Sequence, residues 1–357
     1  MNVLEDAHRA TAPDHARHPT AAIGHRLRQP LSAAAWPAGV AAAAALLLPL
    51  FTSAYWIQVL TAAAVFSVAA LGLSVLYGRV GLISLGQIAM LAAGGWTAQR
   101  LGQTGALPFW LVLLATGVVT GLIGIVIGLP ALRLSGLYLA LITLMLAAAV
   151  TIVLTNTNFP NGGPGFLGYD PVKSGTVPLA RPGVAAGDTA YFRYTVVVCA
   201  LMFLLAIAHT RGRPGRAWAA IRQSEHAAVA AGINVTLYKL WAFALACFMT
   251  GVAGALLAAS AGGLTVYQFP PQESITLLAA LLMAGMYHFA GAVVTGLMLK
   301  AMPALLDTWG VSGNVLLIVF GVGLVQTLVA SPEGIAGRLS RDLARLGARV
   351  RTRRTTS

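Results

Sequence analysis

The sequence predicts an all-α fold, a polytopic bundle of transmembrane helices with about ten passes and both termini in the cytoplasm. Three observations support this prediction. The chain is 58% hydrophobic and only 9% charged, whereas soluble domains average about 25% charged residues. Apolar runs of about 20 residues, long enough to cross the hydrocarbon core of a bilayer, recur along the chain. Basic residues gather in the tails and loops, as the positive-inside rule requires of cytoplasmic segments.

The elements follow in order from a polar tail at residues 1–30, which we expect to be cytoplasmic. The apolar run at residues 31–51 is longer than the core of a signal peptide, usually about 7–15 residues, and another apolar run follows it at once. We therefore predict that it is the first membrane helix. The further predicted spans are residues 55–77, 80–101, 107–129, 134–154, 194–208, 240–262, 275–306 and 311–330. They make up a membrane domain at residues 31–337, and a basic cytoplasmic tail follows at residues 338–357.

Two longer polar segments separate the spans. Residues 155–193 are rich in Gly, Pro and Asn, as expected for a loop, and we place them outside the cell membrane. Residues 210–239 contain a cluster of arginines and are predicted to face the cytoplasm. Here Pro214 and Gly215 precede a predicted helix at residues 216–231, which Gly232 ends in the manner of a C′ glycine.

The number of passes depends on the long apolar run at residues 275–306. Interpreted as one pass, this run places the arginine-rich C-terminal tail outside, against the positive-inside rule. Interpreted as two passes, broken around Gly285 to Gly291, it gives about ten passes and a cytoplasmic tail, with eight or nine as the alternative counts. The first piece is then short for a full crossing, and we expect the bundle to shield it from lipid.

The formal net charge of +13 is explained by membrane topology rather than by nucleic-acid binding. Because the arginines lie mostly in tails and loops, anionic membrane lipid is their expected partner, and no nucleic acid is predicted to bind. Cys199 and Cys247 fall within apolar spans, which argues against a disulfide framework or a metal site. Glycines at G-x-x-x-G spacing, such as Gly117 and Gly121, favour ordinary close helix packing.

The sequence contains no nucleotide-binding or catalytic motif. It has neither a G-x-x-x-x-G-K-[ST] loop nor H-E-x-x-H, so we predict that the chain is not an enzyme and needs no cofactor. The apolar spans hold almost no ionisable residue, and Glu273, Lys300 and Asp307 are predicted to lie near span ends. Ion-coupled carriers commonly place such residues inside the membrane. This pattern therefore indicates a channel, or a transporter driven by another subunit.

Residues 225–234 read Glu-His-Ala-Ala-Val-Ala-Ala-Gly-Ile-Asn. This segment resembles the E-x-A-A-x-x-x-G-I-N form of the coupling loop in permeases of ABC importers for branched-chain amino acids. Residues 215–222 resemble the G-R-A-x-x-A-I-R sequence that precedes this loop in the same family. Further similarities follow in order at residues 73–78, 81–86, 94–98, 136–144, 161–165, 238–243, 251–256 and 331–337. The resemblance covers most of residues 71–339.

The resemblance implies a permease subunit of an ABC importer in the inner membrane of a bacterium. Its expected partners are a second permease subunit, two cytoplasmic ATPases and a periplasmic solute-binding protein, and its solute would be a branched-chain or similar aliphatic amino acid. Closure of the ATPases would act on the coupling loop and switch the pathway. The residues predicted to couple to the ATPase are Arg216, Arg222, Glu225, Ala227, Ala228 and Gly232. Those predicted to lie along the translocation pathway are Ser84, Gly86, Gln87, Gly94, Thr143, Gly285 and His288.

Two departures from the family pattern leave the solute open. Gln87 stands where the family usually has the His of Ser-Leu-Gly-His, and Tyr287 and His288 replace a glycine and a hydroxyl residue. The alternative functions are a channel or secondary carrier, or an ABC permease, for a small neutral solute such as urea or a short amide. A membrane-embedded enzyme is disfavoured, because no nucleophile–base pair or metal-ligand set stands out in the sequence.

Overall fold

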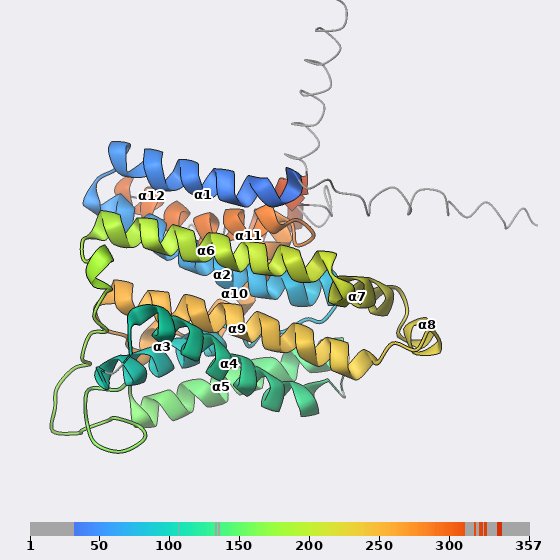
Figure 1. Cartoon of the computed structure of the whole chain (residues 1–357), viewed down its shortest axis with the longest axis horizontal. Helices are drawn as coiled ribbons and strands as arrows, with labels where there is room; N and C mark the ends of the chain where they lie inside the picture. Colours follow the sequence, from blue (N-terminus) through green and yellow to red (C-terminus); the bar gives the residue numbers. More distant parts are fainter. Residues whose placement is uncertain are drawn as a thin grey trace, which may run out of the picture.

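The computed structural model describes residues 32–105, 107–132, 134, 136–310, 318, 321–323, 325–326 and 334–337. In these ranges every regular element is helical, and the long helices lie roughly side by side in one bundle (Figure 1). Among the described residues, six helices are long and apolar enough to cross a membrane. The all-α prediction is confirmed, and the chain has the build of a multi-pass membrane protein.

The first two helices agree with the predicted spans. α1 (Ser32–Phe51) and α2 (Ala54–Leu73) run in opposite directions, and α2 continues into a π-helical segment, η3 (Ser74–Val80) (Figure 1). Residues 81–86 are not helical, and α3 (Gln87–Gln103) begins only after them. The prediction of one continuous span at residues 80–101 was therefore wrong. Gly81 ends η3 with φ of +88°, a left-handed conformation that glycine adopts without steric cost.

The next spans are α4 (Phe109–Ala131), α5 (Leu137–Thr157) and α6 (Asp188–Arg211). Between α5 and α6 the chain forms one short 3-10 turn, η4 (Gly183–Ala185). The predicted external loop at residues 155–193 is thus shorter than expected, since α5 and α6 extend into it from both sides. α9 (Val235–Ala261) packs on α2, α3 and α4 and is the most buried of the six candidate spans, so the core of the bundle lies around it.

The polar segment before α9 is not the single helix predicted at residues 216–231. It forms α7 (Arg213–Gln223) and α8 (Glu225–Ala230), which are separated by Ser224 in an extended conformation, with φ of −162° and ψ of 120°. The Ala227 N–H donates to the Ser224 hydroxyl at 3.3 Å, so this serine caps α8. Gly232 follows α8 with φ of +78°, as predicted for a residue that ends a helix.

The long apolar run at residues 275–306 is broken, as predicted. After η5 (Val266–Gln268), α10 (Gln272–Ala284) ends at Gly285, whose φ is +112°, and α11 (Phe289–Gly296) begins after His288. α11 continues through a π-helical segment, η6 (Leu297–Ala301), into α12 (Met302–Thr308). α10 has 13 residues, which at 1.5 Å per residue is about 20 Å and short for a full crossing.

Both predicted tails and most of the predicted span at residues 311–330 lie outside the described residues. The count of about ten passes and the cytoplasmic location of both termini therefore stay predictions.

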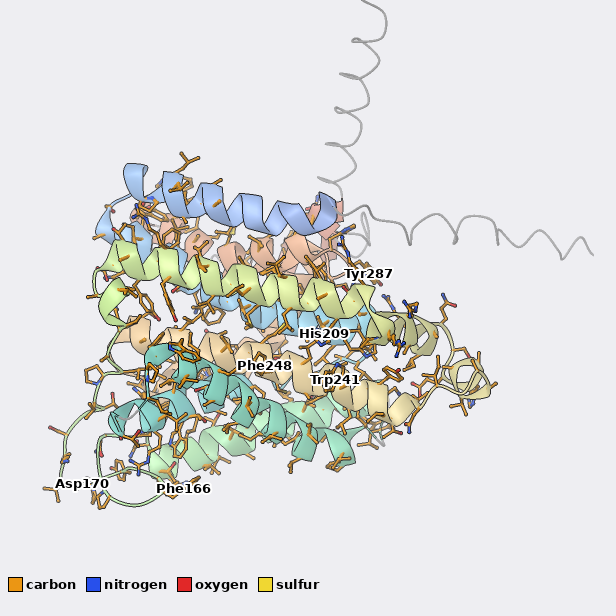
Figure 2. The ribbon with its side chains drawn as sticks, in the orientation of Figure 1. Phe166, Asp170, His209, Trp241, Phe248 and Tyr287 are labelled. Atoms are coloured by element: carbon orange, nitrogen blue, oxygen red, sulfur yellow. The ribbon has the colours of Figure 1, made fainter. Side chains whose placement is uncertain are left out.

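The two polar connections lie at opposite ends of the bundle (Figure 1). α7 and α8 lie at one end, which we call the α8 end. The connection of residues 158–187, with Phe166 and Asp170, lies at the other, which we call the loop end (Figure 2). Asn161 organises this connection, because its amide nitrogen donates to the carbonyl oxygens of Asp170 at 2.7 Å and Lys173 at 3.1 Å.

Candidate functional site

The predicted pathway residues lie in three places rather than in one. Two of these places are interruptions of the membrane helices, and we call residues 81–86 the first break and residues 285–288 the second break. Ser84, Gly86, Gln87 and Thr143 meet at the first break, where all four are buried. Gly285 and His288 belong to the second break, and Gly94 lies in α3.

Side chains from two neighbouring helices hold the first break. The Leu85 N–H donates to the Thr143 hydroxyl of α5 at 2.8 Å. The Thr250 hydroxyl of α9 donates to Gln87 Oε1 at 2.7 Å, and Gln87 is only 1% exposed. Buried polar groups need such partners, so these bonds fix the first break to α5 and α9. Gln87, which replaces a histidine of the family pattern, therefore has a packing role in this chain.

Gly94 lies at a close crossing of α3 and α9. A Cβ atom on Gly94 would overlap the backbone of Gly251, and a Cβ atom on Gly251 would overlap the Thr120 side chain of α4. Small residues at such crossings allow the backbones of membrane helices to approach closely. Helix packing therefore explains Gly94, and its predicted place on the pathway has no contact to support it.

Backbone contacts hold the second break. The Ser74 hydroxyl of η3 donates to the Met286 carbonyl at 2.9 Å. A Cβ atom on Gly78 would overlap that same carbonyl, and a Cβ atom on Gly334 would overlap the backbone of Gly285. The second break thus depends on two glycines that bring η3 and residues 334–337 against it.

Arg222 of α7 links the α8 end to this region. Its guanidinium donates a hydrogen bond to the Gly78 carbonyl of η3 and lies 4.6 Å from the centre of the Tyr287 ring. Tyr287 lies toward the α8 end of the bundle (Figure 2). The ring supplies a cation–π contact that the glycine of the family pattern would lack. Arg222 therefore joins α7 to both η3 and the second break, a role within the chain that the sequence prediction missed.

A second arginine makes a similar contact nearby. The Arg79 guanidinium lies 4.8 Å from the centre of the Phe289 ring, at the start of α11. His288 is half-buried and precedes this helix, and its carbonyl accepts from the Gly291 N–H at 2.8 Å. Two arginine–aromatic contacts therefore surround the second break. Arg222 of α7 contacts Tyr287 within the break, and Arg79 of η3 contacts Phe289 at the start of α11.

Small side chains cover the outer surface of α8. After Glu225 and His226, which are also exposed, the exposed residues of α8 and of the turn that follows it are Ala227, Val229, Ala230, Ala231 and Gly232. Ala228, which was predicted to couple to the ATPase, is only 2% exposed and packs inward. Arg216 and Glu225, two other predicted coupling residues, are exposed.

Two contacts attach α7 and α8 to α9. The Lys239 ammonium lies 2.5 Å from Glu225 Oε1, and Lys239 is 6% exposed. The fully buried Trp218 donates from its indole nitrogen to the Tyr238 carbonyl at 2.8 Å. These contacts fix α7 and α8 to the core helix of the bundle.

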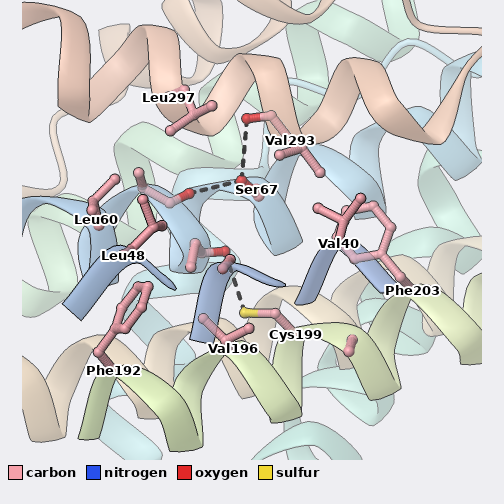
Figure 3. A pocket seen from close by; sticks show the side chains of 14 residues that line it. Val40, Leu48, Leu60, Ser67, Phe192, Val196, Cys199, Phe203, Val293 and Leu297 are labelled. Atoms are coloured by element: carbon pink, nitrogen blue, oxygen red, sulfur yellow. Dashed lines mark hydrogen bonds between the residues drawn. The ribbon is translucent and has the colours of Figure 1, made fainter. Parts of the chain in front are cut away.

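An apolar pocket of about 230 Å³ lies between α1, α2, α6 and the junction of α11 with η6 (Figure 3). Its two polar side chains face carbonyl groups: Ser67 donates to Ala63 at 2.8 Å, and Cys199 donates to Ala64 at 3.4 Å. No predicted pathway residue lines this pocket. It offers an amino acid no free polar partner and does not enter the functional site.

The position of Lys300 along its helix differs from the predicted one. It was expected near a span end, but it lies in η6, inside the run Phe289–Thr308. Its ammonium is 3.8 Å from Glu273 Oε1 of α10. The membrane part of the chain therefore contains a pair of opposite charges that hydropathy alone did not reveal.

The six described helices that can cross a membrane, with α7 and α8 outside them at one end, define an integral membrane protein with a polar connection at its surface. Comparison with known proteins identifies the family. The model of the family "Branched-chain amino acid transport system / permease component" matches residues 55–328, and the chain belongs to this family. It is a permease subunit of an ABC importer, as the resemblance of its coupling loop implied.

Two curated relatives have the same name, high-affinity branched-chain amino acid transport system permease protein LivM. The protein from Salmonella typhimurium is 28% identical over 305 residues, which cover 80% of this chain and 71% of the relative. The protein from Escherichia coli is 27% identical over 305 residues, with the same coverage. No solved structure matches this chain.

Proposed function

We propose that this permease carries branched-chain or similar aliphatic amino acids across the inner membrane of a bacterium. Two cytoplasmic ATPases would bind at the α8 end, a solute-binding protein would deliver the solute at the loop end, and a second permease would complete the pathway. The observation that carries the proposal is the Arg222 contact, because it joins an exposed helix outside the membrane part to a break within it. The curated relatives are permeases of systems for these solutes.

The α8 surface suits a groove on a partner protein. Ala227, Ala230 and Gly232 are small and exposed, so the backbone of α8 can approach a partner closely, as in other helix-in-groove contacts. Lys239 and Trp218 hold this segment to α9. Closure of the ATPases would then move α7, and Arg222 would carry that movement to the second break.

The arrangement of helices supports about ten passes with both termini in the cytoplasm. If the α8 end is cytoplasmic, then α12 ends at the loop end, on the outer side (Figure 1). One more crossing at residues 311–330 would return the basic C-terminal tail to the cytoplasm, where anionic lipid attracts it.

The proposed partners can be tested by capture of the tagged chain from its native membrane and mass spectrometry of the proteins that accompany it. We expect a P-loop ATPase and a second hydrophobic subunit. Scrambling residues 224–232 should remove the ATPase, whereas scrambling the exposed residues 171–175 of the loop end, the matched control, should keep it. Isolation of the chain alone, or only with copies of itself, would contradict the proposal and favour a channel or carrier.

The solute can be tested with the captured complex in proteoliposomes that contain ATP. We expect uptake of labelled leucine that requires both ATP and the solute-binding protein. Uptake of urea or a short amide in place of leucine would contradict the proposed solute while leaving the permease role intact.

A further inference from the structure

Glu273 of α10 and Lys300 of η6 form a loose ion pair within the membrane part of the chain. The Lys300 ammonium lies 3.8 Å from Glu273 Oε1, beyond the roughly 2.7–2.9 Å of a hydrogen-bonded ion pair. The same ammonium lies 3.9 Å from the centre of the Phe66 ring. Phe66 is near the middle of the 27-residue run Ala54–Val80, so the Lys300 ammonium lies about half-way along this span rather than near its end.

One oxygen atom of Glu273 and one of the adjacent residue, Ser274, are buried and lack a partner. Glu273 Oε2 and Ser274 Oγ accept or donate no hydrogen bond among the residues that the structure describes. Buried polar atoms without a partner are rare in native proteins, and such atoms indicate a bound water, ion or ligand. The second carboxylate oxygen of Glu273 and the hydroxyl of the adjacent residue, Ser274, are thus able to bind a further molecule.

The setting of Lys300 also indicates a functional role. It lies in η6, a π-helical segment, and π-helical bulges occur frequently at functional sites. The side chains of Lys300 and Glu273 are 30% and 35% exposed in this chain. Exposure of such charges to lipid is costly, so ionisable residues at this depth usually face a water-filled cavity or protein. This cost favours a place beside protein or a water-filled cavity, rather than lipid, for the face formed by α10 and η6.

We propose that Glu273, Ser274 and Lys300 bind the charged groups of a zwitterionic amino acid during its passage. Glu273 would accept hydrogen bonds from the ammonium group, and Lys300 and Ser274 would donate to the carboxylate. The two charged groups of an α-amino acid are adjacent, as Glu273 and Lys300 are, so one molecule reaches both. A neutral amide such as urea gains less from such a pair. This inference rests on the proposed function and corrects the expectation of a pathway without fixed charge.

The complete importer, reconstituted in proteoliposomes with its ATPases and solute-binding protein, provides the first test. Glu273→Gln and Lys300→Gln should each lower leucine uptake per assembled complex by at least about tenfold. Lys300→Arg, which keeps the charge, should retain most of the uptake. Asp307→Asn removes an exposed acid from the same helical run and should leave uptake unchanged.

The double variant Glu273→Lys/Lys300→Glu separates a binding role from a structural one. It keeps an ion pair but reverses the direction in which a zwitterion must lie, so the account predicts that uptake stays low. Restored uptake would show that the pair only stabilises the bundle and would overturn the proposal. Normal uptake in both single variants would overturn it as well, whereas an unmodified importer that takes up no leucine would contradict the proposed function instead.

A labelling experiment tests the site even if the variants fail to transport. Cys199 and Cys247 are buried, so Lys300→Cys introduces one accessible thiol among the described residues. A water-soluble, membrane-impermeant thiol reagent should label it, and leucine with the solute-binding protein should slow the labelling. Absence of labelling would place Lys300 away from a water-filled pathway and would overturn the proposal.

Discussion

The two breaks in the membrane helices of this permease are held in different ways. The first break is fixed by side-chain hydrogen bonds from helices of the bundle, through Thr143 of α5 and Thr250 of α9. The second break is held by glycine contacts, by a hydrogen bond from the Ser74 hydroxyl of η3 and by Arg222, which belongs to the peripheral helix α7. The comparison teaches that the guanidinium of Arg222 makes its hydrogen bond and ring contact with η3 and the second break, whereas the hydrogen bonds of the first break go to α5 and α9. We infer that the first break is a fixed support and that the second moves with α7.

The largest expected effect comes from closing the space at the second break. Gly78→Val would place a side chain where the Met286 carbonyl lies, and overpacking of this kind costs about 3 kcal/mol of folding stability. We expect little assembled complex and a lower thermal unfolding midpoint in detergent. Gly39→Val is the matched control, since a Cβ atom there meets nothing within 4 Å. Equal stability of the two variants would contradict the close contact between η3 and the second break.

The next effect concerns coupling rather than stability. Arg222→Gln removes the cation–π contact with Tyr287 and the charge-assisted bond to Gly78. We expect the complex to assemble but to transport at least about fivefold less solute per ATP hydrolysed. Tyr287→Phe keeps the aromatic ring and should behave like the unmodified protein, whereas Tyr287→Ala should resemble Arg222→Gln. An unchanged ratio of solute transported to ATP hydrolysed in Arg222→Gln would mean that the second break does not depend on α7.

The smallest effect is expected at the first break. Thr143→Val leaves the Leu85 N–H without its partner, which costs about 1–3 kcal/mol. If the first break is a fixed support, the thermal unfolding midpoint should fall while the solute-to-ATP ratio stays normal. Thr143→Ser keeps the hydroxyl and is the control. A changed ratio with unchanged stability would show that the first break also moves, and the difference between the two breaks would be lost.

The sequence predicted the fold class and most of the spans, because hydropathy and span length determine both. It also predicted the break after Ala284, since Gly285 interrupts a run too long for one pass. It missed the first break because residues 81–86 include several apolar side chains and hydropathy does not distinguish an extended segment from a helix. The interruption depends on the conformation of Gly81 and on a bond to Thr143, which is distant in the sequence.

The candidate site was predicted less completely for the same reason. The coupling loop and Arg222 were found from a local motif, but the contact between Arg222 and Gly78 joins residues 144 positions apart. Ser224 was placed inside a helix, because its alanine-rich surroundings outweighed its strong preference for the N-cap position. The pairing of Glu273 with Lys300 required the antiparallel arrangement of α10 and η6, which no local pattern contains.

The most direct test of the difference between the breaks is a distance measured by paired spin labels in the assembled importer. One label would replace Tyr138, which is 70% exposed on α5 near the support of the first break, and the other Ile335, which is 45% exposed beside Gly334 at the second. We predict that ATP changes this distance in the otherwise unmodified protein and that Arg222→Gln abolishes the change. A distance that ATP does not alter, or a change that persists in Arg222→Gln, would contradict the account.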